Sequence, residues 1–153
     1  MVIEISNNRM RKTVTYSITV QFGDCDPAAI VWFPNFYRWI DAASLHFFVQ
    51  CGVPRWEETT QTLGIIGTPL VDSKASFSKT ASYGDVLDIA VTIPEWRGKS
   101  FVQSYRITRA NPGGAEPDLI MTCDEVRIFA ARREDGKCFR AVPAPDSIRS
   151  LCE

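Results

Sequence analysis

The stretch PNFYRWIDAASLHFFVQCG, residues 34–52, decides the fold. Pro34 suits the first position of a helix and Gly52 suits a C-terminal stop, so the spacing predicts a helix between them. Apolar residues surround this helix, and one stripe at steps of three and four consists of Phe36, Ile40, Ala43, Phe47 and Cys51. A helix that is apolar on nearly every side is buried on more than one side. We therefore expect this helix at the centre of the fold.

Strand patterns lie on both sides of the predicted helix. Residues 13–22 alternate between apolar and polar, which is typical of a half-buried strand. A loop rich in Pro, Gly and Thr is expected at 53–69. Further strands are predicted at 70–80, 86–96, 101–109 and 119–131. Short turn-forming connections at 97–99 and 111–114 favour an antiparallel meander, and the tail at 143–152 has room for one or two helical turns.

This order of elements predicts an α+β fold in which a five-stranded antiparallel sheet wraps around one long central helix. The length of 153 residues suits one domain at 13–153, preceded by a flexible lead-in at 1–12. One sheet covers one side of such a helix. The apolar surface that remains predicts a homodimer, with higher assembly possible.

Composition excludes several classes of protein. Seventeen Lys and Arg against eighteen Asp and Glu give a net charge of −1, which argues against a nucleic-acid partner. No apolar run approaches the ~18 residues of a membrane span, and the N-terminus lacks the apolar core of a secretory signal. Five Cys without a CxxC pair, and a single His, argue against a disulfide scaffold or a zinc site and favour reduced thiols in the cytoplasm.

Asp24 and Asp26 stand two residues apart between the first predicted strand and the predicted helix. One interpretation is a simple turn, since Asp26-Pro27 often opens one. A second is catalytic: a carboxylate would lie at the helix N-terminus, where free N–H groups and a partial positive charge favour a developing oxyanion. A carboxylate beside an oxyanion site can attack an acyl group. Metal binding by the pair is a weaker alternative, because no further carboxylate is obvious nearby.

The same loop carries a family resemblance. FGDCDPA at 22–28 and IVWFPN at 30–35 resemble the signature of the hotdog-fold 4-hydroxybenzoyl-CoA thioesterases, of the type with the catalytic carboxylate in the loop before the central helix. The match continues at 38–39, 41–44, 51–52, 67–69, 75–77, 80–83, 85–87, 95–97, 99–103, 112–114, 124–125, 127 and 140–141. Only the first dozen residues and the extreme C-terminus fall outside it.

The resemblance implies a catalytic role for Asp26, either as nucleophile on the thioester carbonyl or as base for a water molecule. It implies that the backbone N–H of Phe33 holds the thioester oxygen. The family often has Tyr at this position, and the change should be tolerated because the role asks nothing of the side chain.

Asp41 is a carboxylate on an otherwise almost wholly apolar helix, and an unpaired buried charge is costly. It pairs with Arg38, faces solvent, or serves a ligand. The resemblance implies the last of these, because Asp41 matches the residue that receives the ring hydroxyl of the substrate. Thr68 and Trp32 match other positions of the acyl pocket, although Thr68 also suits an ordinary turn before Pro69.

The resemblance also implies a site for coenzyme A, with Arg97, Lys99 and Arg140 on its phosphates. The family has another Arg where this chain has Gly98, so one cation is missing unless a residue such as Arg109 replaces it. No metal and no cofactor is expected, because coenzyme A is part of the substrate. His46 and Cys25 match no functional position of the family.

The function that the resemblance implies is hydrolysis of an aryl-CoA, 4-hydroxybenzoyl-CoA or a close hydroxybenzoyl or benzoyl analogue, in aromatic degradation by a cytoplasmic homotetramer built from dimers. One alternative is a thioesterase for short aliphatic acyl-CoA of the Tol-Pal-associated type. Those relatives usually carry a His beside the Asn near the helix start, where this chain has WFPN at 32–35. A second alternative is a non-catalytic acyl-CoA binder on the same scaffold.

Overall fold

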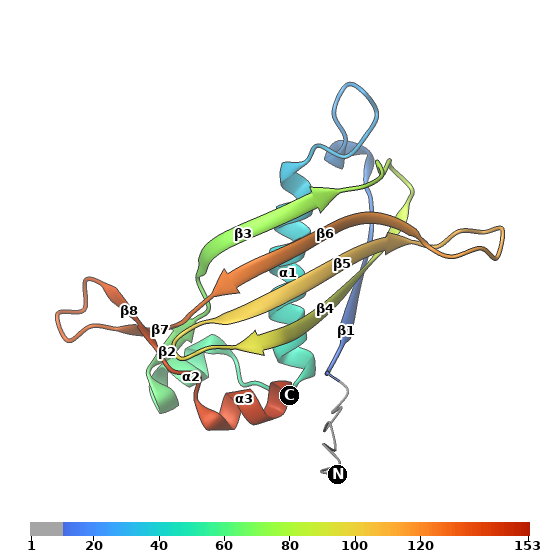
Figure 1. Cartoon of the computed structure of the whole chain (residues 1–153). Coiled ribbons are helices and arrows are strands. Elements are labelled where there is room, and N and C mark those ends of the chain that lie inside the picture. Colours follow the sequence, from blue (N-terminus) through green and yellow to red (C-terminus); the bar gives the residue numbers. More distant parts are fainter. Residues whose placement is uncertain (1–10) are drawn as a thin grey trace, which may run out of the picture.

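The computed structural model describes residues 11–153 (Figure 1). The lead-in predicted at 1–12 lies almost wholly outside the described residues; Arg11 and Lys12 are exposed and have no regular structure. From residue 13 onward the chain forms antiparallel sheets and α-helices, which confirms the α+β class.

A five-stranded antiparallel sheet forms the body of the fold. Its strands are β1 (Val14–Thr19), β3 (Leu70–Phe77), β4 (Val86–Trp96), β5 (Phe101–Arg109) and β6 (Asp118–Arg127), in the order β1-β4-β5-β6-β3. The predicted meander is present as β4, β5 and β6. The strand before it in sequence, β3, pairs instead with β6 and forms one edge of the sheet, while β1 forms the other edge.

The helix predicted at 34–52 is confirmed as α1 (Pro34–Gln50), which lies across one face of this sheet (Figure 1). Pro34 is in its first turn. Gly52, just beyond its end, has a φ of +86°, a left-handed conformation that glycine adopts without strain. The predicted apolar stripe, from Phe36 to Cys51, is buried along its whole length. Leu45 and Val49 of the same helix remain about half exposed, so part of its apolar surface is uncovered by the chain itself.

A second, three-stranded sheet was not predicted. It contains β2 (Ile65–Gly67), β7 (Phe129–Arg132) and β8 (Phe139–Val142), in the order β2-β7-β8. Helix α2 (Trp56–Leu63) precedes β2, so the segment 53–69 is not a simple loop. The strand predicted at 119–131 is in fact two strands, because the chain leaves the large sheet after β6 and joins the small one as β7.

An aromatic cluster connects α1 with both sheets. Phe48 of α1 lies edge-on to Phe101 of β5 and to Phe129 of β7, with ring centroids 6.1 and 6.3 Å away. Aromatic pairs of this kind add about 0.5–1.5 kcal/mol each beyond the area they bury.

Helix α3 (Asp146–Cys152) confirms the helical turns predicted at 143–152. It covers this end of the core with the buried side chain of Ile148.

Three apolar side chains of the predicted strands are left exposed. β1 ends at Thr19, so Phe22, at the end of the strand predicted at 13–22, lies instead in a short 3-10 turn, η1 (Phe22–Asp24), and is 80% exposed. Val71 and Phe77 of the edge strand β3 are 62% and 50% exposed, although the ring of Phe77 lies 5.6 Å from that of Phe36. The protomer itself leaves these positions, in the loop before α1 and on the open edge of the sheet, uncovered.

Candidate active site

The loop between β1 and α1 folds into a narrow hairpin that holds Asp26 next to the start of the helix. Cys25 and Val31 form an antiparallel bridge, and the N–H of Asp26 donates to the carbonyl oxygen of Ile30 at 2.9 Å. The returning arm of the hairpin runs directly into Phe33 and α1. Main-chain pairing therefore fixes the position of Asp26 relative to the helix N-terminus.

The Asp26 carboxylate closes the tip of this hairpin. Its Oδ1 accepts a hydrogen bond from the N–H of Ala28 at 2.8 Å. Ala29 has a φ of +63°, which costs a residue with a Cβ roughly 1–2 kcal/mol, and its carbonyl oxygen accepts a 2.7 Å hydrogen bond from Ser82. The turn interpretation is therefore correct for this loop. It leaves Oδ2 of Asp26 without a partner among residues 11–153, where it is available for chemistry.

Asp24 serves the loop in a different way. Its Oδ2 accepts a hydrogen bond from the N–H of Gln21 at 2.8 Å, which caps the turn η1. In the part of the chain that the structure describes, no group of three or more His, Cys, Asp or Glu could hold a metal ion.

The start of α1 offers one free donor. Pro34 has no N–H, and the N–H groups of Asn35 and Phe36 donate to the carbonyl oxygens of Trp32 and Phe33. The N–H of Phe33 itself has no acceptor among the described residues. It stands at the positive end of the helix dipole, where an oxyanion is favoured.

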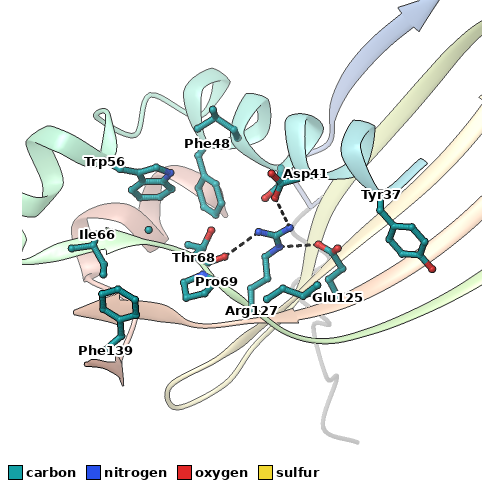
Figure 2. Close-up of a pocket in the computed structure, with 14 residues that line it drawn as sticks. Tyr37, Asp41, Phe48, Trp56, Ile66, Thr68, Pro69, Glu125, Arg127 and Phe139 are labelled. Atoms are coloured by element: carbon teal, nitrogen blue, oxygen red, sulfur yellow. Dashed lines mark hydrogen bonds and ion pairs between the residues drawn. The ribbon is translucent and has the colours of Figure 1, made fainter. Parts of the chain in front are cut away.

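A cavity of about 700 Å³ lies between α1 and the segment that joins β2 to β3 (Figure 2). One part of its wall is apolar and aromatic: Phe48, Trp56, Ile66 and Phe139. The other part is polar and contains Asp41, Thr68, Glu125 and Arg127. The structure thus brings two predicted substrate-binding residues, Asp41 and Thr68, into one cavity that can take an aromatic ring with a polar substituent.

A polar network centred on the buried residues Arg127 and Glu125 forms the polar end of this cavity. The Arg127 guanidinium donates through Nε to Glu125 at 2.8 Å, through Nη1 to the carbonyl oxygen of Thr68 at 3.0 Å, and through Nη2 to Asp41 at 3.2 Å (Figure 2). The Tyr105 hydroxyl lies 2.9 Å from Glu125 and connects the network to the sheet. Asp41 therefore pairs with Arg127 while its side chain stays 77% exposed. The alternative of a local pair with Arg38 is wrong, because Arg38 donates to the side chain of Asn35.

The network determines the protonation states of Arg127 and Tyr105. Burial acts to lower the pKa of Arg127, but the electrostatic influence of Tyr105 and Glu125 and the hydrogen bonds to Glu125 and Asp41 more than offset it and raise that pKa above its ordinary value. Burial likewise raises the pKa of Tyr105 well above its usual range. Arg127 therefore stays charged and Tyr105 stays a neutral donor at any physiological pH.

A smaller cavity of about 300 Å³ lies at the other end of the protomer, beside the helix start. Phe33, Phe36 and Phe77 contribute to its wall. Trp32 is 55% exposed and belongs to the lining of neither cavity. The predicted site residues are thus divided within one protomer, with Asp26 and Phe33 at one place and Asp41 and Thr68 at another.

The predicted phosphate-binding residues lie at the end of the sheet away from the β1–α1 loop. Arg97 and Lys99 are in the turn between β4 and β5, and Arg140 is on β8; both segments lie far from that loop (Figure 1). Arg97 forms a two-pronged pair with Glu95 at 2.8 and 3.1 Å, which raises the pKa of the guanidinium. Arg109 is at the opposite end of β5 from this turn and is bound to Asp85 and Asp118, so it does not replace the cation missing at 98.

Arg127 and Glu125 were missed as site residues, although the sequence carries a signal for them. Cys123, Glu125 and Arg127 share the inward face of β6 with alternate residues. Two opposite charges on an inward face are tolerated only when they are paired. His46, which matches no functional position of the family, packs its ring 5.2 Å from that of Tyr16.

The fold and the loop define a class of protein. A family model described as "Thioesterase-like superfamily" matches residues 20–151. Among residues 11–153 no helix is long and apolar enough to cross a membrane.

Comparison with individual relatives identifies the family within this superfamily. The chain is 50% identical over 143 residues to the 4-hydroxybenzoyl-CoA thioesterase of Pseudomonas sp. strain CBS-3, a match that covers 94% of this chain and 99% of the relative. A crystal structure of an aspartate-to-asparagine mutant of 4-hydroxybenzoyl-CoA thioesterase, complexed with 4-hydroxybenzoyl-CoA, superposes with a TM-score of 0.87 at 48% identity and covers 92% of this chain and 99% of that one. A gentisyl-coenzyme A thioesterase superposes with a TM-score of 0.72 at 29% identity, over 89% and 99% of the two chains. This chain therefore belongs to the hotdog-fold 4-hydroxybenzoyl-CoA thioesterase family and is a thioester hydrolase.

Proposed function

We propose that the protein hydrolyses 4-hydroxybenzoyl-CoA, or a close hydroxybenzoyl or benzoyl analogue, to the free acid and coenzyme A. One observation carries the choice of substrate: the aromatic cavity ends in the carboxylate of Asp41, held there by Arg127. The ring of an aryl group fits the apolar wall, and a ring hydroxyl can donate to the carboxylate. The names of the relatives support the same substrate class.

Asp26 and the N–H of Phe33 would carry the chemistry. As a general base, the free oxygen of Asp26 takes a proton from water, and the hydroxide attacks the thioester carbonyl carbon. As a nucleophile, the same oxygen attacks that carbon and forms an acyl-aspartyl anhydride, which water then hydrolyses. In both routes the carbonyl oxygen becomes an oxyanion facing the N–H of Phe33, and the C–S bond breaks to release coenzyme A as the thiolate.

We further propose that the large sheet wraps around α1 as its central helix, and that two copies pair antiparallel along the exposed edge strand β3. Antiparallel pairing would place the Leu70 end of the partner's β3 beside the Phe77 end of this one. Phe77 lies 5.6 Å from Phe36 in the first turn of α1, so the partner's Asp41 cavity and basic residues would come close to Asp26. This arrangement would reunite the residues that one protomer keeps apart. Pairing of such dimers into a homotetramer, over the half-exposed Leu45 and Val49, is part of the proposal.

The coenzyme A phosphates would bind Arg97, Lys99 and Arg140, with Thr68 and Trp32 near the acyl group. Residues 13–153 would act as one domain. No metal or separate cofactor would take part, so a chelator should leave hydrolysis unchanged. All five Cys are free, which suits the reducing cytoplasm and a role in the degradation of aromatic compounds.

The experiment that tests the function is a substrate panel. Release of the coenzyme A thiol is measured with 4-hydroxybenzoyl-CoA, 3-hydroxybenzoyl-CoA, benzoyl-CoA and butyryl-CoA, and kcat/KM is compared. We expect the hydroxybenzoyl-CoA esters to have the highest kcat/KM. A higher kcat/KM for butyryl-CoA would establish the aliphatic alternative, and binding of aryl-CoA without thiol release would establish a non-catalytic binder.

The shared site is tested with 4-hydroxybenzoyl-CoA by mixing two variants that are each impaired on this substrate. An Asp26→Asn protein and an Asp41→Ala protein are unfolded together and refolded. A mixed dimer has one site with both substitutions and one site with neither, so activity should return only if the two carboxylates of a site come from different copies. Light scattering gives the number of copies, and the refolded single variants are the controls.

A further inference from the structure

Asp41 is an exposed side chain held in place by a buried one. The Asp41 side chain is 77% exposed, whereas that of Arg127, which binds it, is 7% exposed. An exposed aspartate on a helix ordinarily samples several rotamers. Here one carboxylate oxygen is bound by a donor whose own position is fixed, which selects the rotamer that points into the cavity (Figure 2).

Arg127 is fixed because three of its five N–H groups are bound by three different partners. Glu125 takes Nε, the carbonyl oxygen of Thr68 takes Nη1, and Asp41 takes Nη2. These partners lie on β6, on the connection between β2 and β3, and on α1. The planar guanidinium can satisfy all three together because its donors have fixed directions.

A second layer holds Glu125. The Tyr105 hydroxyl lies 2.9 Å from both Glu125 and the side-chain oxygen of Gln103, and Ser44 of α1 donates to the same Gln103 oxygen at 2.7 Å. Gln103 and Glu125 are direct neighbours across β5 and β6. The guanidinium is therefore anchored to the sheet and, through Ser44, to the helix that carries Asp41.

The charges of the cluster favour a neutral donor in the cavity. Arg127 is fully paired with the buried carboxylate of Glu125, so Asp41 leaves the cluster with one net negative charge facing the cavity. A phenolic hydroxyl can donate to that charge. A carboxylate on the ring would meet it with the same sign and be repelled.

We propose that Arg127, oriented by Glu125, is a positioning residue that sets the acyl specificity of the enzyme: it holds the Asp41 carboxylate where a ring hydroxyl must donate. This inference rests on the proposed function of Asp41. The partners of Arg127 are Glu125, Thr68 and Asp41, none of which belongs to the loop that carries Asp26. Replacing Arg127 should therefore lower kcat/KM for substrates that carry the ring hydroxyl and hardly change it for substrates that lack it.

The test is Arg127→Lys, assayed with 4-hydroxybenzoyl-CoA and benzoyl-CoA. Lysine keeps the charge beside Glu125 but has no planar fork to reach Thr68 and Asp41 together. We expect kcat/KM for 4-hydroxybenzoyl-CoA to fall about tenfold, the size of one charged hydrogen bond, with benzoyl-CoA changed less than about twofold. The matched control is Arg109→Lys, because Arg109 also binds two carboxylates and one carbonyl oxygen, at the far end of β5. The control should leave the ratio of the two substrates unchanged.

Two further variants separate the possible outcomes. In an Asp41→Asn background, Arg127→Lys should cause no additional loss of selectivity. Glu125→Gln keeps the Arg127 side chain but weakens the carboxylate contact that orients it, so this variant should lower the same ratio. It serves as the test if the lysine variant does not fold. An equal loss for both substrates, or a loss that persists in the Asp41→Asn background, overturns the role of Arg127. If Asp41→Asn alone leaves the ratio unchanged, the proposed role of Asp41 fails first, and the role of Arg127 with it.

Discussion

The side-chain amide of Asn35, in the first turn of α1, donates a hydrogen bond to the carbonyl oxygen of Asp24 at 2.8 Å. The N–H of Trp32 donates to the same oxygen at 2.9 Å. Asn35 is 6% exposed, so this contact is a buried tie between the helix and the loop that carries Asp26. The distance between the Asp26 carboxylate and the free N–H at the helix start therefore depends on Asn35.

Replacing Asn35 with Ala should loosen the loop while the helix remains. We expect a loss of about 1 kcal/mol in the free energy of unfolding, the net value of one hydrogen bond, and a fall in kcat with little change in KM. Urea unfolding and steady-state kinetics measure the two effects. The control is Asn111→Ala, which removes an exposed turn asparagine that caps Gly113 at 3.3 Å. Equal kinetics for the two variants would contradict a role for Asn35 in the site.

The two aspartates of the loop should behave differently when they are made neutral. Asp26→Asn removes the proposed base or nucleophile and should lower kcat at least ~100-fold, with aryl-CoA binding retained. Asp24→Asn keeps an oxygen that can accept from the N–H of Gln21 and should retain most activity. Thiol release measures the rates, and titration calorimetry with the Asn variants measures binding. Near-wild-type hydrolysis by the Asp26 variant would remove this residue from the mechanism.

Helix and strand periodicity in the sequence predicted the elements whose structure depends on neighbouring residues. The stripe from Phe36 to Cys51 is buried because a period of 3.6 residues places those side chains on one face. The strands predicted at 86–96 and 101–109 are β4 and β5, with the same bounds. The small sheet could not be predicted in this way. β2 has only three residues, and β7 follows β6 after one residue, so neither has a period of its own.

The candidate site shows the same division. The loop with Asp26 is contiguous in sequence, so both its turn and its family motif could be recognised from the sequence. Arg127 and Asp41 are 86 residues apart, and their pairing depends on how α1 crosses β6. Helix periodicity offered only the local partner Arg38 for Asp41. The exposure of Val71 and Phe77 could not be predicted for a related reason, since an apolar edge strand has the same alternation whether the protomer or another copy covers it.

The turn at Gly98 can accept the arginine that the family resemblance expects there. A Cβ at this position would meet nothing within 4 Å, and its φ is outside the left-handed region. Gly98→Arg should lower KM for the acyl-CoA by about two- to fivefold, the value of one exposed ion pair, with kcat unchanged and the effect reduced by salt. Gly113→Arg is the matched control, because it adds the same charge at the opposite end of β5, where its Cβ has an ordinary 3.6 Å neighbour. An equal gain from both variants would indicate a general charge effect.

Acid should weaken the fold partly through Asp118. Hydrogen bonds from Lys79 and Arg109 hold its pKa below the ordinary value of 3.8. Because the unfolded chain then binds the proton more readily than the folded one, the stabilisation is complete above pH 3.8 and is lost as the pH falls through the folded pKa. Asp118→Asn should flatten the fall in the free energy of unfolding over this range. Urea unfolding of the variant and the wild type between about pH 2 and pH 6 measures it, and an unchanged pH dependence in the variant would contradict this role of Asp118.

Thiol labelling should divide the five cysteines into two groups. Cys138 is exposed, and Cys25 is partly exposed in the loop between β1 and α1. Cys51, Cys123 and Cys152 are buried, and burial raises the pKa of each thiol. Since the thiolate is the form that reacts, these three should be alkylated by iodoacetamide at pH 8 only after unfolding, with Cys138 labelled first in the native protein. Mass spectrometry of peptides from native and urea-treated samples measures the order. If Cys152 in the native protein were labelled as fast as Cys138, helix α3 would have to open readily. That result would conflict with the 3% exposure of Cys152 and the position of α3 over the core.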